Sequence, residues 1–90
     1  MLVAKVIGNV VSTRKCESLL GSKFMQVHII ENGKETDKYM IAIDAVGAGI
    51  GETVLITTGS SARVALPKDR EGNEIPADAA IVGIIDYTNE

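Results

Sequence analysis

The stretch AVGAGIGETVLI, Ala45 to Ile56, decides the fold. Its glycines resemble the G-x-G-x-x-G turn that joins a strand to a helix and holds the pyrophosphate of a dinucleotide. The spacing here is G-x-G-x-G, and Glu52 stands where the third glycine of that fingerprint belongs. The residues that follow are β-branched and favour a strand, so no helix N-terminus is available to receive a phosphate, which the Glu52 carboxylate would also repel. The stretch therefore predicts a connection between two strands and argues against a nucleotide site.

The glycines of this connection have two explanations, and the residues alone leave both open. In a tight turn, glycine avoids the penalty that a Cβ atom meets at positive φ. Where several chains meet, small residues allow the backbones to approach closely. The second explanation also fits the composition, because 46% of the 90 residues are hydrophobic and only 3% are aromatic. So high an apolar fraction in a short chain suggests burial between subunits, with an oligomer as the outcome.

The rest of the chain predicts short strands around this connection. Val and Ile dominate the apolar positions, and they pack well on a pleated surface. Asn32-Gly33 is a strong hairpin signal because both positions tolerate positive φ. The segment from Gly59 to Leu66 can form a short helix, with Ser60 or Ser61 capping its first turn. Strands are expected at residues 2–12, 24–31, 39–46, 53–58 and 79–86. These elements describe a mainly all-β fold, a five-stranded antiparallel barrel whose closure removes exposed sheet edges.

Charge and length exclude several classes of protein. The net charge of −3 lacks the basic footprint that neutralises phosphate backbones. No run of about 18 apolar residues is present to span a bilayer, and the N-terminus does not read as a signal peptide. The single cysteine, Cys16, cannot form an internal disulfide and is expected to be an ordinary free thiol in a cytosolic protein. Ninety residues are too few for a complete dehydrogenase.

An enzyme would have to recruit His28, Ser60 or Ser61, and one of the acids Asp44, Asp78 and Asp86. A lone histidine in the middle of a strand is far more often a packing or surface residue than a catalytic base. No second histidine or cysteine has metal-ligand spacing. Asp44 and Asp86 have simpler roles available, since they can bond turn amides or pair with Arg63. We therefore expect no catalytic residue, no metal and no cofactor.

The segment DAVGAGIGETVLITTGSSAR, Asp44 to Arg63, closely resembles the signature of the EutN/CcmL family of bacterial microcompartment vertex proteins. The resemblance extends to GNVVSTRK, LLGSKFMQV and PADAAIVGIID, at residues 8–15, 19–27 and 76–86. It implies a barrel of the oligonucleotide-binding (OB) type over residues 1–86, followed by a tail at 87–90. It also implies a cyclic pentamer that caps the vertices of a polyhedral shell with hexameric or trimeric facet proteins as partners. A head-to-tail interface whose rotation closes makes such a ring.

The resemblance directs attention to two groups of residues. We expect one group at the subunit interface or five-fold axis: Asp44, Val46, Gly47, Ala48, Gly49, Gly51, Glu52 and Arg63. We expect the other to line an axial opening: Gly59, Ser60 and Ser61. Glu52 and Arg63 are candidates for an ion pair between subunits. The long loop at 66–75 has no assigned role. The alternative function is an OB-fold module for nucleic acid or a small ligand, but three aromatic residues and a negative charge disfavour stacked bases.

Overall fold

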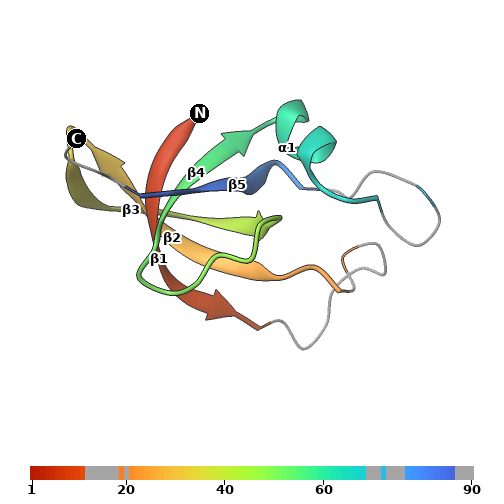
Figure 1. The fold of residues 1–90 in the computed structure, drawn as a ribbon, viewed down its shortest axis with the longest axis horizontal. Helices are drawn as coiled ribbons and strands as arrows, with labels where there is room; N and C mark the ends of the chain where they lie inside the picture. The colour runs from red at the N-terminus through yellow and green to blue at the C-terminus, as the bar shows by residue number, and fades with distance from the viewer. Residues whose placement is uncertain (12–18, 20, 69–71, 73–76, 87–90) are drawn as a thin grey trace.

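The computed structural model describes residues 1–11, 19, 21–68, 72 and 77–86, and Figure 1 shows their fold. Five strands and one short helix follow one another along the chain, and most of the strands curve around a common interior. Their bounds are β1 Leu2–Val10, β2 Phe24–Glu31, β3 Lys34–Asp44, β4 Thr53–Thr58, α1 Ser60–Ala65 and β5 Ala79–Ile85. None of the helices in these residues has the length and hydropathy of a membrane span.

The strands close into a barrel in the order β1-β2-β3-β5-β4, with β4 pairing back to β1. This arrangement confirms the predicted five-stranded barrel with one short helix. The prediction that it is antiparallel is wrong at one seam, because β3 and β5 run parallel and pair only at Ile43–Ala80 and Asp44–Ile81. Parallel neighbours need a crossover connection. Here the chain between β3 and β5 passes through β4 and α1 before it returns to the barrel.

Two predicted strands, β2 and β4, have the bounds that the sequence indicated. The third strand begins at Lys34 instead of Tyr39, since its polar first half pairs with β2 directly after the turn, where Glu31 lies opposite Lys34. Asn32 and Gly33 have φ values of 53° and 76°, so both residues of the turn are left-handed as the Asn-Gly signal predicted. The pairing of β2 with β3 therefore begins at the two residues that flank the turn, Glu31 and Lys34.

The barrel interior is filled by small and medium apolar side chains that alternate along each strand. Residues Met25 and Val27 of β2 face inward with no exposed area, while Gln26 between them is half-buried. A single side chain, Ala48, enters this core from the connection between β3 and β4. The buried members of the core are Ala4, Val6, Met25, Val27, Ala42, Ala48, Val54, Ile56, Ala79 and Ile81.

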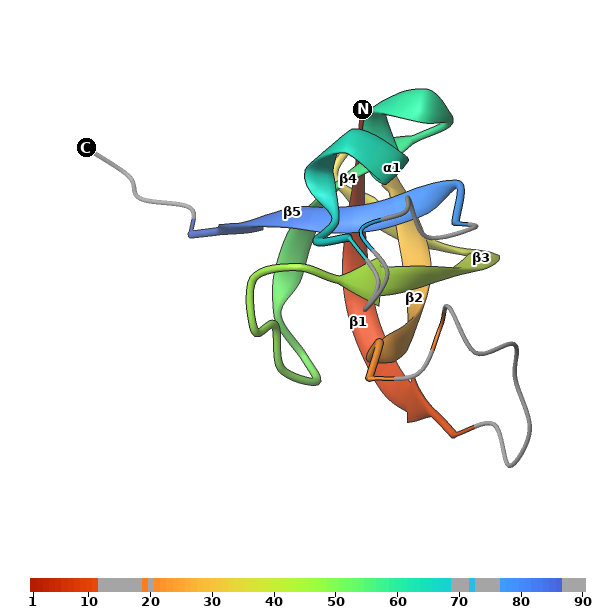
Figure 2. The same ribbon diagram turned by 90° about the vertical axis from the view of Figure 1, so that its right-hand side faces the viewer.

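A second apolar cluster lies between α1 and the outer surface of the barrel. Ala62 and Leu66 pack there against Ile43 and Ala80, so the helix covers the seam between β3 and β5. Figure 2 shows α1 at one end of the barrel, above β5. The predicted serine cap is wrong: Gly59 occupies the N-cap position, with no side-chain hydrogen bond to the first turn. The Ala62 N–H donates to the Gly59 carbonyl instead, at 3.1 Å.

Candidate functional site

The connection Ala45–Glu52, called the glycine loop below, is held against the barrel by backbone hydrogen bonds at both ends. The Ala45 N–H donates to the carbonyl of Ile81 on β5 at 3.2 Å. At the other end, the Gly51 N–H donates to the Val6 carbonyl at 2.8 Å, and the Val6 N–H donates to the Glu52 carbonyl at 2.9 Å. With Ala48 inserted in the core as well, the loop is attached to β1, β5 and the interior at once.

Asp44 is the main anchor of the glycine loop. Its side chain is 2% exposed. Its Oδ1 accepts hydrogen bonds from the amides of Val46 at 3.0 Å and Gly47 at 3.1 Å, and its Oδ2 accepts one from the amide of Ala48 at 2.8 Å. A buried carboxylate is tolerable only when its oxygens are bonded in this way. The sequence-based expectation that Asp44 bonds turn amides is confirmed.

Lys23 completes this anchor from the residue before β2. Its Nζ lies 3.8 Å from Asp44 Oδ2 and donates to the Ala48 carbonyl at 3.3 Å. The Lys23 side chain is about half exposed, so water screens the ion pair and its contribution to stability is small. Lys23 therefore balances the charge of Asp44 and links the glycine loop to β2. Nothing in the residue pattern of the loop pointed to Lys23, because it lies far from the loop in the sequence.

Glu52 holds the next amide in the loop. Its Oε1 accepts a hydrogen bond from the Gly49 N–H at 2.6 Å, while the Glu52 N–H donates to the Gly49 carbonyl at 3.2 Å. Together, Asp44 and Glu52 bind four consecutive amides, those of residues 46 to 49. A run of backbone N–H groups is the feature that receives phosphate in nucleotide-binding loops. Here the chain's own carboxylates occupy those amides, which gives a direct structural reason to reject the nucleotide interpretation.

The glycines of the loop serve its geometry in two ways. Gly47 and Gly51 have φ values of 82° and 92°, a conformation that strains residues with a Cβ atom. Gly49 has no such φ, but a Cβ atom there would lie 3.2 Å from Glu52 Oε1. The turn explanation is therefore sufficient for these three positions within one chain. Close approach of neighbouring chains stays a prediction.

The glycine loop also carries apolar side chains into solvent. Ile50 at its tip is 62% exposed and Val46 is 41% exposed. The loop crosses the face of the barrel that Figure 1 presents to the viewer, between the ends of β3 and β4. An anchored loop with exposed branched aliphatic side chains is suited to contact another protein, because little conformational entropy is lost when it binds.

The other predicted interface residues lie in different environments. Gly59, Ser60 and Ser61 are exposed at the start of α1. The Gly59 N–H donates to the Asp78 carbonyl at 2.8 Å, which fixes this corner to the start of β5. Arg63 is half-buried on α1. Ala48 is buried, so only its backbone is available to a neighbouring chain. The proposed pairing of Arg63 with Glu52 across subunits stays a prediction.

Two of the residues that an enzyme would recruit, His28 and Asp44, are engaged elsewhere. His28 Nδ1 lies 3.0 Å from Glu35 Oε1 on the outer surface of the β2–β3 hairpin, and Glu35 also faces Lys5 at 3.8 Å. The carboxylate of Asp44 is occupied by the glycine loop. Within the described ranges, no group of three or more metal-binding side chains comes together. Cys16, the tail at 87–90 and most of the loop at 66–75 lie outside the described residues.

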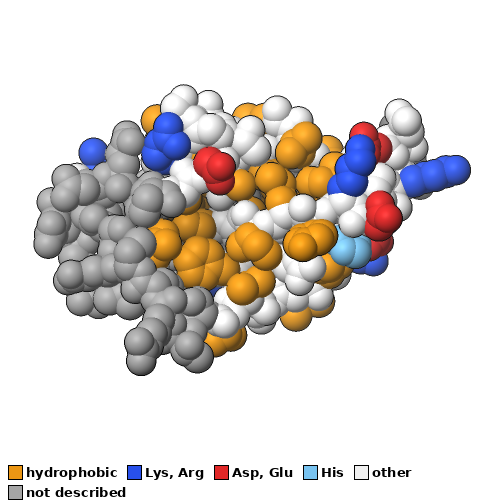
Figure 3. Space-filling view, turned by 180° about the vertical axis from the view of Figure 1, so that it is seen from behind, with side chains coloured by type: hydrophobic (Ala, Val, Ile, Leu, Met, Phe, Trp, Pro, Cys, Tyr) orange, Lys and Arg blue, Asp and Glu red, His pale blue; other side chains and the backbone are white. Residues whose placement is uncertain are grey.

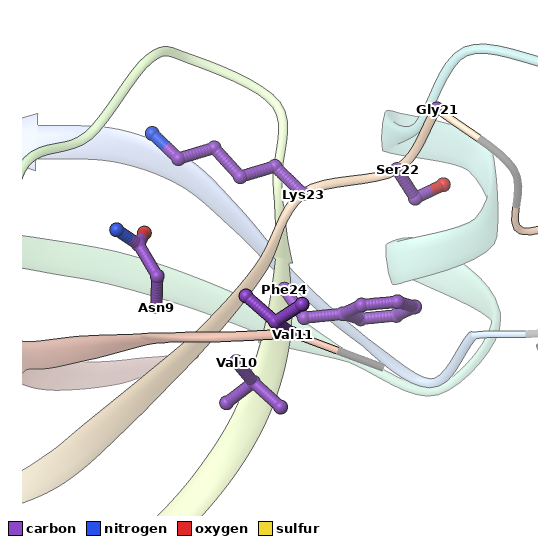
Figure 4. A pocket seen from close by; sticks show the side chains of 7 residues that line it. All are labelled: Asn9, Val10, Val11, Gly21, Ser22, Lys23 and Phe24. Atoms are coloured by element: carbon purple, nitrogen blue, oxygen red, sulfur yellow. The ribbon is translucent and has the colours of Figure 1, made fainter. Parts of the chain in front are cut away.

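Two hollows indent the surface near Phe24. The larger one, about 410 Å³, is shown in Figure 4, where the Phe24 ring points toward α1 and the Lys23 side chain extends the opposite way. It is lined by Asn9, Val10, Val11, Gly21, Ser22, Lys23 and Phe24. The smaller one, about 160 Å³, is called the β3 groove below. It is lined by Leu19, Phe24, Ile41, Ile43, Ala77, Asp78 and Ala79.

Comparison with known proteins gives consistent results over almost the whole chain. The family model described as "Ethanolamine utilisation protein EutN/carboxysome" matches residues 1–86. The carboxysome shell vertex protein CcmL of Synechocystis sp. is 44% identical over 90 residues, covering 99% of this chain and 86% of that protein. The microcompartment shell vertex protein GrpN of Rhodospirillum rubrum is 45% identical over 87 residues, covering 96% of this chain and 93% of that protein.

Solved structures match the fold equally well. The structure of Gloeobacter violaceus CcmL superimposes with a TM-score of 0.86 at 37% identity, covering 100% of this chain and 90% of that one. The structure of GrpN, described as a pentameric microcompartment shell protein, superimposes with a TM-score of 0.83 at 40% identity, and all of both chains are covered.

Proposed function

The chain belongs to the EutN/CcmL family, and from this membership we infer that it is a structural shell vertex protein of a bacterial microcompartment and not an enzyme. The observation that carries this inference is the agreement of the entire barrel with a pentameric shell protein, which covers 100% of each chain. The anchored glycine loop presents apolar side chains outward, as an assembling protein requires.

We propose that five copies form a closed ring. In a head-to-tail ring, each copy uses one surface toward the neighbour ahead and a different surface toward the neighbour behind. The glycine loop and the start of α1 supply one of these surfaces, through Asp44, Val46, Gly47, Ala48, Gly49, Gly51, Glu52 and Arg63. The exposed aliphatic side chains of Val46 and Ile50 support this assignment, since burying them against a neighbouring copy stabilises the assembly.

The corner formed by Gly59, Ser60 and Ser61 is proposed to face the five-fold axis. All three residues are exposed, and neither serine is used to cap α1. Their hydroxyl groups are therefore available to line a polar opening. The ring would sit at the vertices of a shell in the cytoplasm, with hexameric or trimeric facet proteins around it, because a five-fold tile gives a sheet of six-fold tiles its curvature.

The mass of the assembly tests this proposal. Native mass spectrometry and light scattering at low micromolar concentration are expected to show a particle of five times the 9.5 kDa chain. Co-production with facet proteins from the same gene cluster should give closed shells that lose their vertices when this chain is omitted. A protein that is monomeric or dimeric throughout the concentration range would contradict the ring. Shells that close normally without it, and without a paralogue, would contradict the capping role.

A further inference from the structure

The ring proposed above needs two complementary surfaces on each chain, and the glycine loop is only one of them. The second surface has to lie on a different side of the barrel and has to accept an apolar side chain. Figure 2 shows the glycine loop on one side of the barrel, at the left, and the β2–β3 side opposite it, at the right. The β3 groove lies on that β2–β3 side, since Phe24, Ile41 and Ile43 belong to these strands.

The β3 groove exists because the outer face of β3 is only partly covered. Met40 and Ala42 point toward the core, so the alternate residues Ile41 and Ile43 point outward. The second cluster buries Ile43, whereas Ile41 remains 43% exposed. β5 pairs with β3 only at Ile43 and Asp44, so the described part of β5 leaves the rest of β3 open on this edge. The groove is therefore an apolar hollow at an incomplete seam of the barrel.

The lining and size of the β3 groove favour one aliphatic side chain as its occupant. Among the seven residues that line it, only Asp78 is charged. A volume of about 160 Å³ is small for a peptide or a typical organic ligand, whose pockets measure roughly 300–1,000 Å³. Figure 3, which shows the side of the molecule opposite to Figure 1, has hydrophobic side chains in its middle and charged side chains gathered mostly at one end. The centre of this face thus suits an apolar contact.

Within the glycine loop, Ile50 is the exposed aliphatic side chain that best suits such a groove. It projects from the tip of the glycine loop with 62% of its area exposed. The loop is fixed by Asp44 and Glu52, so Ile50 is held in place before it binds. Val64 is also exposed, but it lies on α1, whose buried side packs against Ile43 of the groove itself. Val64 thus belongs to a helix that already packs beside the groove of its own chain, which favours Ile50 as the side chain that enters the groove of the next copy.

We propose that in the ring the Ile50 side chain of one copy packs into the β3 groove of the next copy, against Phe24, Ile41 and Ile43. The pairing rests on the proposed ring and assigns its two surfaces. It leaves Val46 to pack at the margin of the same contact. Repeated around five copies, it turns two exposed apolar features of the monomer into five buried contacts.

Two substitutions separate the two surfaces. Ile50→Asp destroys the loop surface and leaves the groove intact, while Ile41→Asp destroys the groove and leaves the loop intact. Each variant alone is expected to be a monomer where the unmodified chain is a pentamer, because a buried, unpaired carboxylate weakens the contact roughly a hundredfold or more. The matched control is Val64→Asp, which adds the same charge at an exposed aliphatic position that belongs neither to the glycine loop nor to the lining of the β3 groove, and it is expected to remain a pentamer.

Mixing the two monomeric variants gives the discriminating result. The intact Ile50 of the Ile41→Asp chain can enter the intact groove of the Ile50→Asp chain, but no further contact is possible. The mixture is therefore expected to form a one-to-one heterodimer and no ring, measured by sedimentation at concentrations up to the millimolar range. Circular dichroism checks that each variant is folded. If an aspartate variant unfolds, the corresponding Ile50→Ser or Ile41→Ser variant replaces it.

Disulfide trapping gives an independent measurement in the intact assembly. In a Cys16→Ser background, the double variant Ile41→Cys/Ile50→Cys is expected to form covalent chains of up to five copies on mild oxidation, while Val64→Cys/Ile50→Cys is not. A wild-type pentamer in which both aspartate variants still assemble, or in which the Ile41–Ile50 crosslink does not form, overturns this pairing and leaves the ring standing. A wild-type chain that is not a pentamer overturns the ring itself, and the pairing with it.

Discussion

Replacing Asp44 by alanine removes one carboxylate and leaves three backbone amides without their acceptor. The amides of Val46 and Gly47 lie at the surface, where water can replace the lost oxygen. The amide of Ala48 is partly buried, and Ala48 itself is only 1% exposed. Water therefore cannot easily replace the carboxylate oxygen that this amide loses. Hydrogen bonds to a charged group contribute about 1.5–3 kcal/mol each, and an unsatisfied buried donor costs about 1–3 kcal/mol.

The expected cost of Asp44→Ala is about 3 kcal/mol, with most of it arising at Ala48. Asp44→Asn is expected to cost less, about 2 kcal/mol, because the amide oxygen still serves Val46 and Gly47 while its NH₂ group faces the donating Ala48 N–H. The ion pair with Lys23 adds little, since Lys23 is about half exposed. A loss of this size is a large fraction of the roughly 5–15 kcal/mol of an ordinary domain.

Urea unfolding at one fixed protein concentration measures the loss, and a repeat at tenfold dilution separates it from any effect of assembly. Amide hydrogen exchange supplies the local measurement, with faster exchange expected first at Ala48. Asp37→Asn, on the exposed part of the β2–β3 hairpin, is the matched control and should change stability by no more than about 0.5 kcal/mol. The assignment of Asp44 as the anchor would be refuted if the Asp44→Ala protein had the same free energy of unfolding as the control and its Ala48 amide stayed protected from exchange.

Two further substitutions test other parts of the structure. Gly51→Ala should cost about 1–2 kcal/mol in thermal unfolding, because φ is 92° there and no atom crowds the new Cβ. Gly8→Ala, equally uncrowded but without a positive φ, should be close to neutral, and equal losses would contradict the strain argument. The hydrogen bond and charge of Glu31 raise the pKa of the Lys38 amine above its ordinary 10.5. The favourable pairing is thus complete below that value and is lost as the pH rises through the raised pKa; an NMR titration that Glu31→Gln leaves unchanged would contradict this cause.

The elements that the sequence predicted best are those with a local cause. β2 alternates between apolar and polar residues, β4 is a short run of mostly β-branched residues, and both end next to turn-forming residues, so their bounds follow from a few neighbours in the chain. The polar first half of β3 has no such alternation and becomes a strand only because the Asn-Gly turn places Lys34 opposite Glu31. The parallel contact of β3 with β5 depends on the path of the chain through α1, and no local pattern records it.

The same distinction applies to the site. Asp44 precedes the amides it binds by two to four residues, so its role as a turn anchor was predictable from the sequence. Ser60 and Ser61 had equally suitable chemistry for a cap, but Gly59 begins α1 with a φ of 67° and its carbonyl receives the Ala62 N–H. Lys23 and the β3 groove arise from residues that are far apart in the chain, and only the closed barrel brings them together.

Glu52 explains why a glycine loop of this kind serves a structural purpose. A dinucleotide turn leaves its amides unpaired for an anion that arrives from solution, and its third glycine lets the following helix pack closely against the strand. At that third position this chain has a carboxylate, which binds the Gly49 amide and completes the set that Asp44 begins. The anion is then part of the chain, so the loop keeps its shape without a ligand. The outer side of the loop carries Val46 and Ile50, whose aliphatic side chains are exposed. Covering them with another protein removes apolar surface from water and so stabilises the contact.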